Sequence, residues 1–135
     1  MNFDWKLFLV ILVTLLTIDF IWIGYITKQA WSELIETVQK TPLSVRLDWA
    51  FLTYLVMALG IYGLVLRSDE FTIYQRAFIL GLVMYGVFDG TNRALFNDWT
   101  LNMSMMDVAW GTVLVVVTVY LTPQIRSTLK KYFKF

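Results

Sequence analysis

Three aspartates of this 135-residue chain lie in long apolar stretches, where a charged side chain is costly to place. They are Asp19, Asp89 and Asp107. A carboxylate at the centre of a membrane-spanning helix costs ~2.5–3.5 kcal/mol to insert. Acidic side chains in such positions serve to bind protons, cations or polar ligands. These three aspartates are therefore the first candidates for chemistry.

Two of the aspartates begin the same short motif. Asp19 is followed three residues later by Trp22, and Asp107 is followed three residues later by Trp110. Residues three apart lie on one face of a helix. The spacing predicts a carboxylate beneath an indole ring, whose face can also bind a cation.

One face of the third apolar stretch is rich in polar groups. At helical spacing it carries Tyr85, Asp89, Asn92 and Arg93. Asp89 and Arg93 are four residues apart, so we expect them to pair directly. Gly86 and Gly90 form a G-x-x-x-G step, which predicts the close approach of a neighbouring helix.

The composition excludes several classes of function. The chain has no cysteine and no histidine, which rules out disulfides, thiol nucleophiles, serine–histidine triads and histidine-ligated metals. Eleven Lys and Arg residues against ten Asp and Glu residues leave a net charge of +1, which predicts no nucleic-acid partner. We expect no cofactor and no metal, but carboxylates alone can hold Mg²⁺ or Ca²⁺, and that alternative stays open.

Four apolar stretches are long enough to cross a bilayer as helices, for which about 20 residues are needed. They cover residues 7–25, 49–66, 77–96 and 101–121. Of the residues, 59% are hydrophobic, and the mean hydropathy is +0.65. This composition and the four stretches predict an all-α, polytopic membrane protein with a single transmembrane domain over residues 1–135. Pro123 is expected to end the fourth helix. The first stretch lacks a cleavage pattern, and we expect it to be retained.

The longest connection, residues 26–48, joins the first two stretches. Its apolar residues repeat at helical spacing, with acidic residues on other faces: Trp31, Leu34, Ile35 and Val38 against Glu33 and Glu36. This pattern predicts a short amphipathic helix at the outer membrane surface.

The basic residues predict the orientation. Four spans place both termini on one side, with seven Lys and Arg residues there: Lys6, Arg67, Arg76, Arg126, Lys130, Lys131 and Lys134. The other side carries four: Lys28, Lys40, Arg46 and Arg93. The positive-inside rule therefore predicts a multi-pass protein of the cell membrane with both termini in the cytoplasm. The tail from Lys130 to Phe135 is expected to anchor at the interface between lipid and water.

The positions of the aspartates along their spans predict that they meet. Asp19 and Asp89 lie about twelve residues from the cytoplasmic ends of their spans, and Asp107 lies about six residues from the outer end of the fourth. At about 1.5 Å of rise per residue, all three reach one depth to within roughly a helical turn. Since three acids at one level are too costly to face lipid, we expect them to converge inside the helical bundle.

Several of these segments resemble one known family. The Asp19-x-x-Trp22 motif, the run from Tyr85 to Asn92, Trp99 and the Asp107-x-x-Trp110-Gly111 motif are similar to the DUF2177 family of predicted membrane proteins. The resemblance extends over essentially the whole chain. It implies a compact four-helix integral membrane protein and supplies no established activity.

Together these features predict a ligand-binding site, and three interpretations of its function stay open. The expected site residues are Asp19, Trp22, Tyr85, Asp89, Asn92, Arg93, Asp107 and Trp110. The favoured interpretation is binding or transport of a small cationic or polar substrate, or of protons, by a homo-oligomer surrounded by membrane lipids. The second is a lipid-modifying enzyme, or enzyme subunit, acting on head groups at the outer leaflet. The third is a structural or regulatory membrane partner whose polar residues only fix packing.

Overall fold

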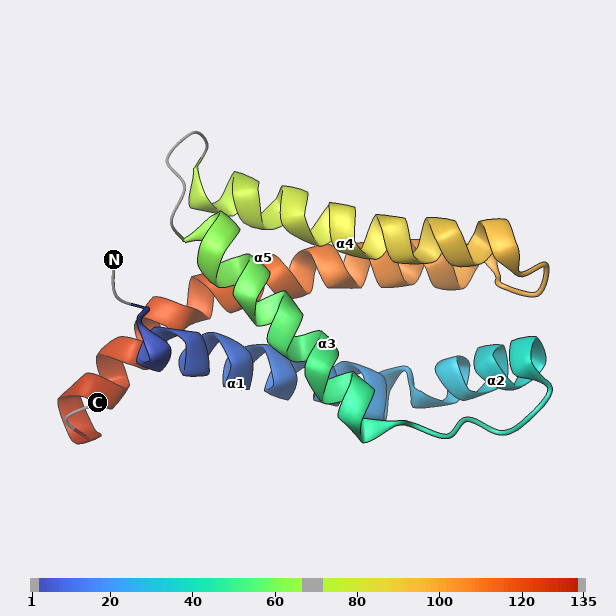
Figure 1. Cartoon of the computed structure of the whole chain (residues 1–135), viewed down its shortest axis with the longest axis horizontal. Coiled ribbons are helices and arrows are strands. Elements are labelled where there is room, and N and C mark those ends of the chain that lie inside the picture. The colour runs from blue at the N-terminus through green and yellow to red at the C-terminus, as the bar shows by residue number, and fades with distance from the viewer. Residues whose placement is uncertain (1–2, 67–71, 134–135) are drawn as a thin grey trace.

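A computed structural model describes residues 3–66 and 72–133, which are almost entirely helical (Figure 1). Its elements are α1 (Trp5–Ile21), the π-helical segment η1 (Trp22–Ile26), α2 (Lys28–Gln39), α3 (Leu47–Gly60), the π-helical segment η2 (Ile61–Val65), α4 (Ile73–Leu95) and α5 (Leu101–Phe133). The described residues contain no strand. The prediction of an all-α chain is therefore confirmed.

Within the described residues, three segments are long and apolar enough to cross a membrane. They are Trp5–Ile26, Leu47–Val65 and Leu101–Phe133. Helix α4 is not among them, and it contains Gln75, Arg76, Asp89, Asn92 and Arg93. A count of four spans thus remains a prediction.

The long helices pack lengthwise around a mainly aliphatic core. Helices α4 and α5 run side by side, α1 packs against α5, and α3 crosses the bundle obliquely and packs against α1 (Figure 1). Side chains from all of these layers are fully buried where they meet, among them Ile11, Leu15, Ile61, Ala77 and Leu114. This packing fixes the relative positions of α1, α4 and α5, which carry the three aspartates.

Helices α4 and α5 approach each other closely at Gly81. A Cβ atom there would lie 2.7 Å from Cα of Thr112 and 3.1 Å from the carbonyl oxygen of Gly111. By contrast, a Cβ atom at Gly86 or Gly90 would meet nothing within 4 Å among the described residues. The prediction that the G-x-x-x-G step makes the close contact is wrong, because the close contact is at Gly81, five residues before Gly86 and nine before Gly90.

Pro123 does not end α5, which continues to Phe133. Proline removes one intrahelical hydrogen bond, but side chains on either side of it support the turn. The hydroxyl of Thr122 donates to the Thr118 carbonyl at 2.7 Å, and the amide of Gln124 donates to the Tyr120 carbonyl at 3.0 Å. Beyond the proline, Arg126 forms an ion pair with Asp4. The continued helix is therefore held by tertiary contacts that the local sequence does not reveal.

Asp4 joins three elements at this end of the bundle. It caps α1 by accepting from the backbone N–H of Leu7 at 3.0 Å, and it pairs with Arg126 of α5. Its own backbone N–H donates to the Tyr62 hydroxyl of η2 at 2.8 Å. The backbone hydrogen bond from Leu7, and then the Arg126 guanidinium, lower the pKa of the Asp4 carboxyl group from its usual value.

At the opposite end of the bundle, the connection that contains α2 contacts the loop between α4 and α5. Helix α2 occupies residues 28–39 of the predicted amphipathic segment, and its location at a membrane surface stays a prediction. Lys40 at its end forms an exposed ion pair with Asp98 at 3.3 Å. The Trp31 ring lies 6.0 Å from that of Trp99, centroid to centroid. Of the predicted interfacial tail, residues 134 and 135 lie outside the described part of the chain.

Candidate functional site

Asp19 is buried in the bundle with both carboxylate oxygens hydrogen-bonded. It is 3% exposed on α1. The Tyr54 hydroxyl of α3 donates to its Oδ2 at 2.6 Å, and the Trp110 indole of α5 donates to its Oδ1 at 2.8 Å. Asp19 therefore links three helices, and these two bonds satisfy one acceptor position on each oxygen.

The two D-x-x-W motifs interlock across the helices. The ring of Trp22 stacks on that of Trp110, with centroids 4.2 Å apart and planes 9° from parallel. Trp110 bonds to the aspartate of the other motif, so the expectation that each indole covers its own carboxylate is wrong. The N–H of Trp22 is buried without a partner in the described residues. The packing of α1 against α5 brings the two motifs into direct contact.

Asp89 is bound by Trp99 and does not pair with Arg93. The Trp99 indole donates to Oδ1 of Asp89 at 3.0 Å, and Nη1 of Arg93 donates to the Trp99 backbone carbonyl at 2.6 Å. The described residues contain no ion pair between Asp89 and Arg93. The expected pairing is wrong because the loop after α4 folds back and places Trp99 against both side chains.

Asp107 lies against Asp89 in the interior. Their side chains are within hydrogen-bonding reach, and both are buried, with exposures of 4% and 1%. Asp107 also interacts electrostatically with Asp19. Tyr85, whose ring packs over Gly111, is electrostatically coupled to all three aspartates. The structure thus brings the acids of three helices into one cluster.

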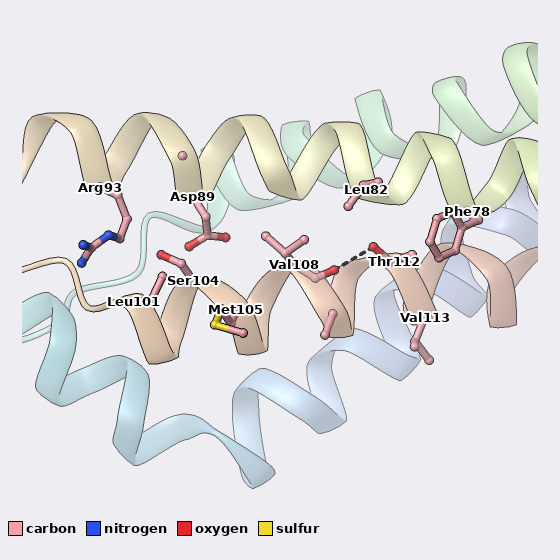
Figure 2. Close-up of a pocket in the computed structure, with 12 residues that line it drawn as sticks. Phe78, Leu82, Asp89, Arg93, Leu101, Ser104, Met105, Val108, Thr112 and Val113 are labelled. Carbon is pink, nitrogen blue, oxygen red and sulfur yellow. Dashed lines mark hydrogen bonds between the residues drawn. The ribbon is translucent and has the colours of Figure 1, made fainter.

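One carboxylate oxygen of this cluster lacks a donor. Oδ2 of Asp89 is buried and has no hydrogen-bond partner in the part of the chain that the structure describes. Two ionised carboxylates have no hydrogen to share, so this oxygen is satisfied only when the pair holds a proton or another group donates to it. The hydroxyl of Ser104, 7% exposed on α5, is likewise unpartnered among the described residues. Figure 2 shows both groups pointing into the space between α4 and α5.

Three residues of the cluster were not among the predicted site residues, although Trp99 was named for the family resemblance. Tyr54 and Trp99 bond the aspartates, and Ser104 faces Asp89. The position of Tyr54 within an apolar stretch was a usable signal, whereas Trp99 and Ser104 lie in or near a polar loop. Of the predicted residues, Asn92 makes no side-chain hydrogen bond within the described chain, and its backbone carbonyl accepts from Phe96. No group of three or more potential metal ligands is found in the described residues.

The fold and this buried acidic cluster define a polytopic helical membrane protein. The family model described as "Predicted membrane protein (DUF2177)" matches residues 5–123. The chain therefore belongs to this family, and the resemblance read from its motifs is confirmed. No curated protein and no solved structure matches the chain.

Proposed function

We propose that this protein binds a small cationic ligand, or a proton, at the Asp89–Asp107 carboxyl pair and transports it across the membrane. The supporting observation is the buried Oδ2 of Asp89, which lacks a donor and lies beside a second carboxyl group. Among the described residues, neither aspartate forms an ion pair. The pair therefore has acceptor capacity that a cation can use.

Electrostatics favours a positive occupant. Two carboxylates in contact repel strongly where the dielectric constant is low, and such pairs bind protons as a unit. The titratable or charged groups around the pair are Asp19 from α1, Tyr54 from α3, and Tyr85 and Arg93 from α4. Arg93 is exposed and bonded to a backbone carbonyl, so a ligand or proton must supply the missing positive charge.

The roles of the remaining residues follow from their bonds. Because Asp19 is bonded by Tyr54 and Trp110, it acts as a support that positions Trp110. The stacked pair of Trp22 and Trp110 forms an aromatic wall beside the acids. Polarised rings of this kind stabilise a nearby cation by cation–π contact.

The proposal includes four membrane spans with both termini in the cytoplasm. Helix α4 has 23 residues and is about 34 Å long, enough to cross a ~30 Å core beside α5. The bond between Asp4 and Arg126 places the start of α1 and the last part of α5 at one end. Two of the seven basic residues assigned to that side, Arg67 and Lys134, lie outside the described residues. Since one protomer has little internal volume, we propose that the transport path is completed by a homo-oligomer.

Binding of n-butylammonium to the purified protein in an uncharged detergent tests the cation site. Isothermal titration calorimetry is expected to show affinity losses of at least about tenfold in Asp89→Asn and in Asp107→Asn. Asp48→Asn is the matched control, because Asp48 is exposed and lies 4.0 Å from Arg46. Unchanged affinity in both site variants would overturn the proposal. For transport, uptake of labelled n-butylammonium into proteoliposomes is expected with the wild type and not with Asp89→Asn.

A lipid-modifying enzyme is the second candidate. The groove between α4 and α5 reaches Asp89 from the apolar surface, and an acid pair can act as general acid and base. This candidate predicts altered head groups when the protein is incubated with vesicles, with or without Mg²⁺. Unaltered lipids together with n-butylammonium binding favour the first proposal.

A further inference from the structure

An open groove of about 720 Å³ runs between α4 and α5. Its walls are mostly apolar, and they include Phe78, Leu82, Met105, Val108 and Val113. Four of these side chains are exposed on the outer surface of the bundle. Along α4 the groove extends from Phe78 to Arg93, a distance of about 22 Å at the rise of a helix. The groove is therefore long, and it is open along the exposed apolar surface of the bundle.

One end of the groove is polar and unsatisfied. Asp89 and Ser104 line this end (Figure 2), and each has a buried oxygen without a partner in the described residues. Asp107 interacts with Asp89 and does not itself line the groove. Two side chains that can accept hydrogen bonds, Asp89 and Ser104, thus lie at the end of an apolar groove. A groove that served only to accommodate neighbouring hydrocarbon chains would not need this arrangement.

We propose that the groove binds a membrane amphiphile with a primary ammonium head group, and this rests on the cation site proposed above. The ammonium donates to the two groove-lining acceptors, Asp89 and Ser104, while Asp107 adds negative charge beside Asp89. The hydrocarbon chain lies along the groove toward Phe78. A head group with only negative charge is disfavoured, because the buried acceptors would repel it. Arg93, the cationic residue at this end, already donates to the Trp99 carbonyl.

The hydrocarbon chain of the ligand contributes chiefly to the selectivity of binding. In a bilayer the surrounding lipid tails are as apolar as the groove, so moving the ligand's hydrocarbon chain from lipid into the groove gains no hydrophobic free energy. Any gain in affinity comes from close packing against the groove walls. A chain held along α4 and α5 also delivers its ammonium group to Asp89 from within the membrane. A small hydrophilic amine makes only the head-group contacts. The groove therefore predicts a preference for long-chain over short-chain ammonium ligands.

Two probes of equal charge and different length test this inference. Calorimetry of n-dodecylammonium and n-butylammonium in an uncharged detergent is expected to show at least about tenfold tighter binding of the longer probe. Ala109→Trp fills the groove from its exposed wall and is expected to bring the affinity ratio close to one without weakening n-butylammonium binding. Ala94→Trp, on an exposed position that does not line the groove, is the matched control. Met105→Trp is a second groove-filling variant should Ala109→Trp fail to fold.

The outcomes separate this inference from the cation site. If both groove-filling variants leave the preference for n-dodecylammonium unchanged, partitioning into detergent explains the preference and the groove proposal is overturned. If wild type binds both probes equally and Asp89→Asn abolishes both, the cation site stands and the groove proposal fails. If neither probe binds, both proposals fail. Tighter binding of dodecanoate than of n-dodecylammonium would also overturn the ammonium assignment.

Discussion

The indole of Trp110 donates a hydrogen bond to the carboxylate of Asp19 at 2.8 Å, across 91 positions of sequence. This bond joins the first and last helices at the level of the acidic cluster. It also sets the position of the Trp110 ring, on which Trp22 stacks. The two aspartates that accept a hydrogen bond from a tryptophan thus differ in their remaining oxygen. Both oxygens of Asp19 accept a hydrogen bond, whereas only one oxygen of Asp89 does so among the described residues.

Removing the Tyr54 hydroxyl is expected to destabilise the bundle. Tyr54→Phe leaves Oδ2 of Asp19 without its donor at 2.6 Å, and hydrogen bonds between membrane helices contribute about 1 kcal/mol. Titration with sodium dodecyl sulfate, followed by circular dichroism, measures this loss in the free energy of unfolding. Tyr74→Phe changes an exposed tyrosine and should have no effect. Equal effects of the two variants would contradict the assigned role of Tyr54.

The contact between α4 and α5 predicts opposite effects of two glycine substitutions. Gly81→Ala places a methyl group 2.7 Å from the Thr112 Cα atom, and overpacking of this kind costs about 1–3 kcal/mol. Gly86→Ala meets nothing within 4 Å in the described residues and should gain up to about 1 kcal/mol from helix propensity. The same unfolding titration distinguishes them. A larger loss for Gly86→Ala would restore the G-x-x-x-G step as the contact.

The bond between Asp4 and Arg126 predicts a pH dependence of stability. Hydrogen bonding from Leu7 and the charge of Arg126 lower the pKa of Asp4 from 3.8. A carboxyl group with a lowered pKa stabilises the folded state above its unfolded pKa, and this contribution disappears as the pH falls through the folded pKa. Asp4→Asn is therefore expected to lower the free energy of unfolding at pH 6 by at most about 1 kcal/mol.

Below pH 3.8, the ordinary pKa of aspartate, the difference between wild type and Asp4→Asn should shrink progressively. Thermal unfolding in an uncharged detergent, followed over this range, measures the change. Asp98→Asn removes the exposed pair with Lys40 and serves as the control with little expected effect. A difference for Asp4→Asn that stays constant with pH would contradict the coupling to its charge.

The helical class, the family and the clustering of the acids could be predicted from the sequence. They depend on composition, on the length of the apolar stretches and on the spacing of residues along a helix. Long apolar stretches predict helices whatever their neighbours, and acids at one depth are driven to the interior. The partners of each acid could not be predicted. Asp89 and Arg93 have ideal spacing for a pair, but the fold brings Trp99 between them. Pro123 likewise ends helices in most settings, and the continuation of α5 past it is explained by the bonds of Thr122 and Gln124 and by the contact of Arg126 with Asp4.

The most direct test of the central claim compares the stability of Asp19→Asn with that of Asp89→Asn. Asn at position 19 has only one carbonyl oxygen for two donors, so we expect a loss of about 1–2 kcal/mol in the free energy of unfolding. Asn at position 89 can still accept from Trp99, while its amide donates toward Asp107. The free energy of unfolding of Asp89→Asn is therefore expected to be unchanged or increased, because the repulsion between the carboxylates of Asp89 and Asp107 is removed. A loss for Asp89→Asn as large as that for Asp19→Asn would show that Asp89 serves packing, and it would contradict the account.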